Sequence, residues 1–204
     1  MKTDNEKVKI LLVDDSPENL IALEATLESL GQELVKASSG IEALRHLLED
    51  DFAAILLDVR MPEMDGFETA TLIRSRKRSR NTPILFLTGY KNEEHLFRGY
   101  DLGAVDFLFK PIVPEILHSK VSVFVELSKN SKLLKRQTNE LQRAEASTRA
   151  VLEAAPEAMI IFDRDQRIRS VNTEAERLFG YTRDVLIGQS MARLSPEWSA
   201  VRAG

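Results

Sequence analysis

Residues 53–58 read Ala-Ala-Ile-Leu-Leu-Asp, an apolar run that ends on a carboxylate. Four apolar runs end on polar side chains in this way: 10–13 on Asp14 and Asp15, 53–57 on Asp58, 84–87 on Thr88, and 107–109 on Lys110. Short, wholly apolar runs are typical of strands buried on both faces of a parallel sheet. Amphipathic stretches separate them, at 18–30, 40–49, 67–76 and 93–101. The sequence therefore predicts an α/β fold, a doubly wound five-stranded parallel sheet with right-handed crossovers.

The polar residues that follow these runs predict one site, because the carboxyl ends of parallel strands meet at one edge of the sheet. Carboxylates from Asp14, Asp15 and Asp58 would repel there by about 4 kcal/mol per pair at 4 Å and an effective dielectric of 20. A divalent cation would relieve this repulsion, which indicates a Mg²⁺ site. A hydroxyl (Thr88) and an ammonium (Lys110) beside it suit a phosphoryl group, with Asp58 as nucleophile.

At these residues the chain from about Lys7 to Leu127 resembles a response-regulator receiver domain, which has a flavodoxin-like fold. Four motifs carry the resemblance, in the order of the family: Leu12-Val13-Asp14-Asp15-Ser16, Leu57-Asp58-Val59-Arg60-Met61-Pro62-Glu63-Met64-Asp65-Gly66, Phe86-Leu87-Thr88-Gly89, and Gly103-Ala104-Val105-Asp106-Phe107-Leu108-Phe109-Lys110-Pro111.

The resemblance implies a role for each site residue. Asp58 would accept a phosphoryl group from a histidine kinase or phosphotransfer protein, and Thr88 and Lys110 would hold its oxygens. The implied Mg²⁺ ligands are Asp15, Asp58 and the main-chain carbonyl of Arg60, with Asp14 acting through water. Phe107 and Thr88 would form the conformational switch. Lys110-Pro111 resembles the cis peptide of the family, and X-Pro bonds adopt cis at low cost.

Taken singly, these residues have ordinary alternatives. Asp14 and Asp15 could cap the helix that begins near Pro17, although Ser16 is the better N-cap. Asp58 could be a turn aspartate, and Lys110 a surface lysine whose stem covers apolar groups. We favour the joint interpretation, because chance would have to place all five polar residues at matching strand ends in one order.

Composition limits the other classes of function. With 204 residues, 43% of them hydrophobic, the chain has room for a full domain and a second element. It has no apolar stretch of about 20 residues and no apolar core of a signal peptide, which predicts a cytoplasmic protein without a membrane partner. It has no cysteine, and its net charge of −4 makes nucleic acid an unlikely partner. The basic run 74–80 is interpreted as a solvated helix end rather than a binding patch.

A long helix is predicted after the receiver domain, because 115–152 contains neither Gly nor Pro. Six of its residues fall on a heptad pattern: Phe124, Leu127, Leu134, Leu141, Thr148 and Leu152. Polar residues interrupt the seam, so the pattern favours a marginal parallel coiled coil, and thus a homodimer, over a solitary linker helix.

From Val151 onward the sequence resembles the first half of a PAS domain. A predicted hairpin at 159–171 is followed by Asn172, which would begin a short helix, and then by Leu178-Phe179-Gly180-Tyr181 and Leu186-Ile187-Gly188. Two strands are too few for a stable sheet, so we expect a fragment of a longer sensor protein.

The predicted domains are a receiver (1–127), a helical linker or coiled coil (128–150) and an incomplete PAS segment (151–204). The expected function is a phosphoacceptor, not an enzyme within this chain, that relays a signal through the dimeric helix to a PAS-linked output. The alternatives are a constitutive dimerisation scaffold, or the regulatory fragment of a histidine kinase or diguanylate cyclase.

Overall fold

The computed structural model describes residues 7–89 and 106–190 of the chain. Two compact units are present, Met1–Leu134 and Lys135–Gly204. The predicted helix at 93–101 lies outside the described residues. None of the described helices combines the length and the apolar character needed to cross a membrane.

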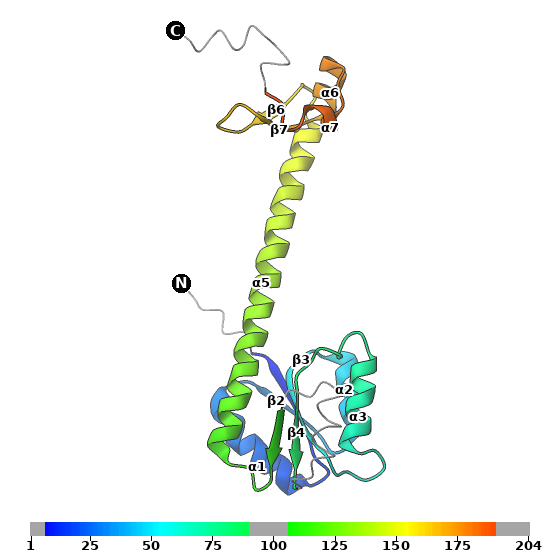
Figure 1. Cartoon of the computed structure of the whole chain (residues 1–204), viewed down its shortest axis with the longest axis vertical. Helices are drawn as coiled ribbons and strands as arrows, with labels where there is room; N and C mark the ends of the chain where they lie inside the picture. Colours follow the sequence, from blue (N-terminus) through cyan, green and yellow to red (C-terminus); the bar gives the residue numbers. More distant parts are fainter. Residues whose placement is uncertain (1–6, 90–105, 191–204) are drawn as a thin grey trace. The chain divides into compact units, whose positions relative to one another are not determined.

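The first unit is built on a five-stranded parallel sheet in the order β2-β1-β3-β4-β5. Figure 1 labels β2, β3 and β4 of this sheet. Its strands are β1 (Lys9–Val13), β2 (Glu33–Ala37), β3 (Phe52–Asp58), β4 (Ile84–Thr88) and β5 (Asp106–Phe109). Every residue of the central strand β3 is buried, as its uninterrupted apolar sequence predicts. The predicted doubly wound α/β fold is therefore confirmed.

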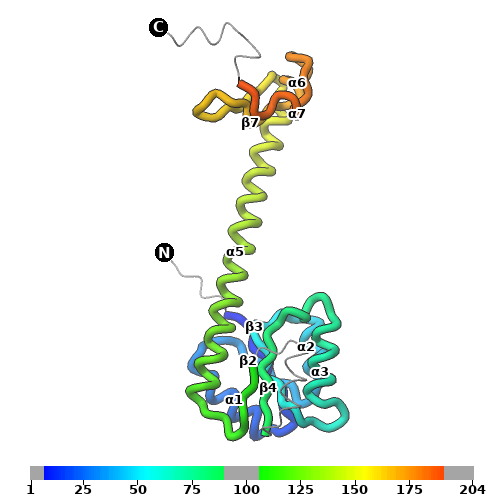
Figure 2. Tube along the Cα trace, viewed as in Figure 1, coloured from blue at the N-terminus to red at the C-terminus, as the bar shows by residue number. Residues whose placement is uncertain are grey.

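Helices cover both faces of this sheet (Figure 2). These helices are α1 (Pro17–Leu27), α2 (Gly40–Glu49), α3 (Gly66–Ser75) and the first part of α5 (Pro114–Ala154), with a 3₁₀ turn, η1 (Glu28–Leu30), after α1. The apolar side chains of α2 and α3 pack in one core cluster and those of α1 and α5 in the other. The sheet is thus packed between two apolar cores, which together fix the positions of the strands that carry the site residues.

Local sequence explains where the helices next to the site begin. Ser16 caps α1 by accepting from the Asn19 N–H at 3.3 Å, with Pro17 in the first turn, so the predicted N-cap is confirmed. Asp65 and Glu68 form a capping box at the start of α3. These caps fix the starts of the two helices that follow the strands ending at Asp14 and Asp58.

Helix α5 is a single helix over the stretch without Gly or Pro. Leu117, Val121 and Val125 are its buried residues, whereas 130–151 is exposed throughout. The predicted long helix is therefore confirmed.

The second unit contains the predicted antiparallel hairpin, β6 (Ile160–Phe162) with β7 (Ile168–Val171). Two short helices follow, α6 (Thr173–Phe179) and α7 (Arg183–Leu186). Four buried residues form their common core: Ile168, Val171, Ala175 and Leu186. This core is small, and side-chain hydrogen bonds and an ion pair connect the elements around it.

Candidate functional site

Asp58 is the last residue of β3, and its side chain is buried although it is acidic. Its Oδ2 accepts from the Arg60 N–H at 2.7 Å. The next residue, Val59, donates its N–H to the Leu87 carbonyl on β4 at 3.0 Å. The Asp58 carboxylate is therefore held at the carboxyl end of the sheet by its own strand and by the following turn.

Lys110 brings the separate strand ends together. Its Nζ lies 2.5 Å from Asp58 Oδ1 and 2.9 Å from Asp14 Oδ2, although Asp14 is 96 residues away in sequence. Its main-chain N–H donates to the Thr88 carbonyl at 2.7 Å. The Lys110-Pro111 peptide is cis, as the family resemblance implied. These contacts exclude the alternative that Lys110 is an ordinary surface lysine.

Asp14 is almost fully buried, with 1% of its surface exposed. Its Oδ1 accepts from the Ser16 N–H at 3.0 Å and from Asn19 Nδ2 at 2.9 Å, while Oδ2 faces Lys110. Asn19 was not among the predicted site residues. No motif marks Asn19, because its sequence position resembles that of any polar residue in a first helical turn.

The electrostatic balance of the site suits a cation. Burial raises the pKa of Asp58, and the hydrogen bond and charge of Lys110 only partly oppose this effect. Burial by itself would lower the pKa of Lys110, but its hydrogen bonds to Asp58 and Asp14 raise it above the ordinary value. Two buried carboxylates, those of Asp14 and Asp58, thus share the single ammonium of Lys110. Their oxygen atoms could therefore bind a further cation.

Asp15 differs from the other two predicted acidic ligands, because it is exposed. Among residues 7–89 and 106–190, no three His, Cys, Asp or Glu side chains lie close enough together to hold a metal ion. The structure therefore gathers Asp14 and Asp58 around Lys110. The assignments of Asp15 and of the Arg60 carbonyl to Mg²⁺ stay predictions.

The two predicted switch residues are buried. Thr88 ends β4 with 4% of its surface exposed, and Phe107 on β5 has 6% exposed. The Phe107 ring stacks on Phe86 at a centroid distance of 5.3 Å, and Phe86 lies 4.9 Å from Phe67 of α3. The Phe107 ring is thus part of the core between the sheet and α3.

Gly66 allows the start of α3 to approach Asp58 closely. A Cβ atom at this position would lie 2.3 Å from the Asp58 carbonyl oxygen and 2.9 Å from Val59 Cα. Both obstacles are backbone atoms, which cannot turn aside as a flexible side chain would. The Gly66 N–H also donates to the Val59 carbonyl at 2.9 Å. Gly66 therefore belongs to the site as a positioning residue.

The basic run 74–80 is largely occupied by contacts within the receiver unit. Arg78 donates to the Leu48 and Glu49 carbonyls at the end of α2 and pairs with Asp51 at 2.8 Å. Arg76 donates to the Leu44 carbonyl, and Arg74 donates to main-chain carbonyls of the 80–82 turn. These cations bind carbonyls of α2 and of the 80–82 turn, because the chain after α3 passes beside the end of α2. Their sequence position had instead suggested a role at the end of α3.

Comparisons with known proteins agree with this geometry. Residues 10–122 match the family model described as response regulator receiver domain, and residues 146–201 match the PAS fold. The receiver domain of a sensor histidine kinase from Pseudomonas aeruginosa, whose structure is described with a magnesium ion coordinated in the active site cleft, is 31% identical, with a TM-score of 0.55. That likeness covers 59% of this chain and 99% of the other.

Two curated relatives are each similar in sequence to this chain, but their names describe different activities. A probable cyclic di-GMP phosphodiesterase of Vibrio cholerae is 34% identical over 68% of this chain and 31% of its own length. The transcriptional regulatory protein SrrA of Staphylococcus aureus is 34% identical over 71% of this chain and 56% of its own length. The chain thus spans 31% of one relative and 56% of the other. On its receiver fold, site and family match, the chain belongs to the response regulator receiver family of two-component signalling, with a PAS segment after the receiver domain.

Proposed function

We propose that Asp58 is the phosphoryl acceptor of this receiver domain and that a histidine kinase or phosphotransfer protein is the donor. The observation that carries the proposal is the buried Asp58 carboxylate, 2.5 Å from the Lys110 ammonium at the carboxyl edge of the sheet. The family match supports the same assignment. The chain is then a phosphoacceptor, and any output enzyme belongs to another part of the protein.

The proposed transfer needs no redox step. A carboxylate oxygen of Asp58 attacks the phosphorus atom of the phosphohistidine as the phosphorus–nitrogen bond breaks, and the leaving imidazole regains its lone pair. Lys110 and the Thr88 hydroxyl hold the oxygens of the transferred group. The phosphoryl group carries a charge of about −1.5 to −2. Because the Asp58 oxygen loses its own negative charge as the new bond forms, the site gains about one negative charge, and the Lys110 ammonium would become shared with the new phosphoryl oxygens.

The residues that would hold Mg²⁺ are Asp15, Asp58 and the Arg60 carbonyl, with Asp14 acting through water. When bound, the ion supplies positive charge against the carboxylates and the phosphoryl oxygens. The excess of buried negative charge around Lys110 supports this assignment.

We further propose that α5 passes the signal to a PAS-linked output as a dimer. Leu127, Leu134 and Leu141 repeat every seven residues and are 60–63% exposed, which supports an interface with a second copy. The names of the two curated relatives, a phosphodiesterase and a transcriptional regulatory protein, point to different outputs. The proposed limits of the three parts remain 1–127, 128–150 and 151–204.

The test uses beryllofluoride, a phosphoryl mimic, together with Mg²⁺. We expect the mass measured by light scattering, or the NMR spectrum of the receiver unit, to change in the wild type but not in Asp58→Asn. A small phosphodonor should add one phosphoryl group to the wild type and none to Asp58→Asn. The matched control is Asp51→Asn, an exposed aspartate of the same unit, which should behave as the wild type.

The alternative function is a constitutive dimerisation scaffold. It predicts a dimer of the same mass with and without the mimic, and no phosphoryl group on the protein after incubation with a donor kinase. Phosphorylation that persists in Asp58→Asn would contradict the assignment of the acceptor.

A further inference from the structure

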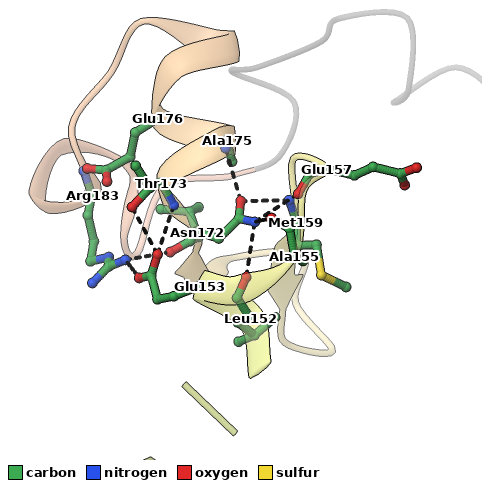
Figure 3. Close-up of polar contacts among 11 residues, drawn as sticks. Leu152, Glu153, Ala155, Glu157, Met159, Asn172, Thr173, Ala175, Glu176 and Arg183 are labelled. Carbon is green, nitrogen blue, oxygen red and sulfur yellow. Dashed lines mark hydrogen bonds and ion pairs between the residues drawn. The ribbon is translucent and has the colours of Figure 1, made fainter. Parts of the chain in front are cut away.

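Among the described residues of the second unit, Asn172 is the most deeply buried polar residue, with 0% of its surface exposed. It lies between the end of β7 and the start of α6 (Figure 3). Its Oδ1 accepts from the Ala175 N–H of α6 at 3.0 Å and from the Met159 N–H ahead of β6 at 2.8 Å. It therefore serves as the N-cap of α6, as predicted, and it also fixes the start of the hairpin.

The other half of the same side chain satisfies the end of α5. Asn172 Nδ2 donates to the Leu152 carbonyl at 3.1 Å and to the Glu157 carbonyl at 2.8 Å. The last carbonyls of a helix have no partner within the helix, so an external donor replaces water there. One amide group thus caps the N-terminus of α6 and the C-terminus of α5.

Glu153, in the last turn of α5, forms a second connection to α6 (Figure 3). Its Oε2 accepts from the N–H and the hydroxyl of Thr173, each at 3.0 Å, and its Oε1 pairs with the Arg183 guanidinium. The hydrogen bond from the Thr173 N–H, together with Arg183, lowers the pKa of Glu153. The carboxylate therefore stays charged at neutral pH and binds the first residue of α6.

Arg183 extends these contacts to the sheet and the core. Its Nη2 also donates to the Val171 carbonyl of β7 at 2.9 Å, and its main-chain N–H donates to Glu176 Oε1 at 2.5 Å. In the described part of the chain, its buried Nε has no hydrogen-bond partner. A buried donor without a partner costs stability. The other contacts of Arg183, to Glu153, Glu176 and Val171, must offset this cost.

We propose that Asn172, Glu153, Thr173 and Arg183, here called the α5–α6 network, make the last turn of α5 and the first turn of α6 one cooperative unit. A displacement of the end of α5 is then transmitted to the start of α6. The two helix ends share their capping groups, and neither can move without breaking hydrogen bonds of the buried Asn172 amide. This inference concerns the second unit alone and does not depend on phosphorylation of Asp58.

The test measures amide hydrogen exchange by NMR in the full chain. Glu153→Gln removes the charge on α5, and we expect the Ala175 amide, which Glu153 does not touch, to exchange about tenfold faster. Asn172→Asp keeps the acceptor that caps α6 but removes the donor for the α5 carbonyls. We expect it to speed exchange both in the last turn of α5 and at Ala175. The control Glu157→Gln keeps the main-chain acceptor and should change neither.

The proposal is overturned if each variant changes only the amides that its own side chain contacts. Amides of the β6–β7 hairpin report whether a variant is still folded. If either variant loses the protection of the hairpin, Ala146→Gly is used in its place. This substitution weakens α5 at an exposed position outside the network by about 1 kcal/mol, which corresponds to amide exchange about fivefold faster. Parallel acceleration of the Thr173 and Ala175 amides supports the cooperative unit, and unchanged rates at these two amides refute it.

Discussion

Replacing Gly66 with alanine tests how tightly α3 positions the phosphoryl acceptor. The new Cβ would lie 2.3 Å from the Asp58 carbonyl oxygen, where ordinary contacts begin at 3.4 Å. Backbone of β3 or α3 must therefore move by about 1 Å, and overpacking of this kind costs about 1–3 kcal/mol. Because the obstacle is backbone, we take the upper end of this range, a cost of about 3 kcal/mol. The better helix propensity of alanine offsets about 1 kcal/mol of this cost. The expected net loss is about 2 kcal/mol.

Urea unfolding followed by circular dichroism measures this loss. With a slope of about 2 kcal/mol per M, the midpoint should fall by about 1 M. The shift should also slow phosphorylation from a small phosphodonor by about tenfold or more, because a displacement of 1 Å at a reacting group can cost about a hundredfold.

Gly89→Ala is the matched control for Gly66→Ala. The nearest atom to a Cβ at Gly89 is Arg60 Nη2 at 3.9 Å, an ordinary contact, so stability should change by no more than about 0.5 kcal/mol. An unchanged midpoint for Gly66→Ala, or an equal loss for both variants, would refute the argument that close backbone approach makes glycine necessary at 66.

Three further predictions concern the other parts of the chain. Arg78→Ala should lower the urea midpoint through a loss of about 1 kcal/mol, because the α2 carbonyls lose their cap, whereas Lys77→Ala should change it little. Leu141→Lys should raise the dimer dissociation constant, measured by sedimentation, at least about tenfold, and an unchanged constant would place the interface elsewhere. The pKa of Glu153 is lowered in the folded state, so its contribution is present above the ordinary value of 4.5 and is lost as the pH falls through the folded pKa. Amide protection at Thr173 should therefore decline in acid below that value, and in Glu153→Gln this decline should be absent.

The receiver fold could be predicted from local patterns, because strands buried on both faces must be apolar throughout. The run that ends at Asp58 shows this, since every residue of β3 is buried. Ser16 and Asn172 were recognised as helix caps for a similarly local reason, because a cap bonds to N–H groups two or three residues away.

The candidate site could be predicted only as a list of residues at strand ends. The pairing of Lys110 with Asp14 and Asp58 joins three different strands, and the exposure of Asp15 separates it from its sequence neighbour. Asn19 and Gly66 joined the site only through the structure, because their roles depend on which backbone or side chain lies opposite.

By itself, the sequence determined the order of strands and helices, the residue types at the sheet edge and the length of α5, since each follows from local apolar periodicity, helix caps or an absence of Gly and Pro. Tertiary structure alone decided how distant groups share their charges and hydrogen bonds. The basic run became a set of caps for α2, and Asn172 came to serve α5 as well as α6. The physical reason is that a side-chain donor or acceptor binds whichever group the folded chain places within about 3 Å, and sequence separation does not limit that distance.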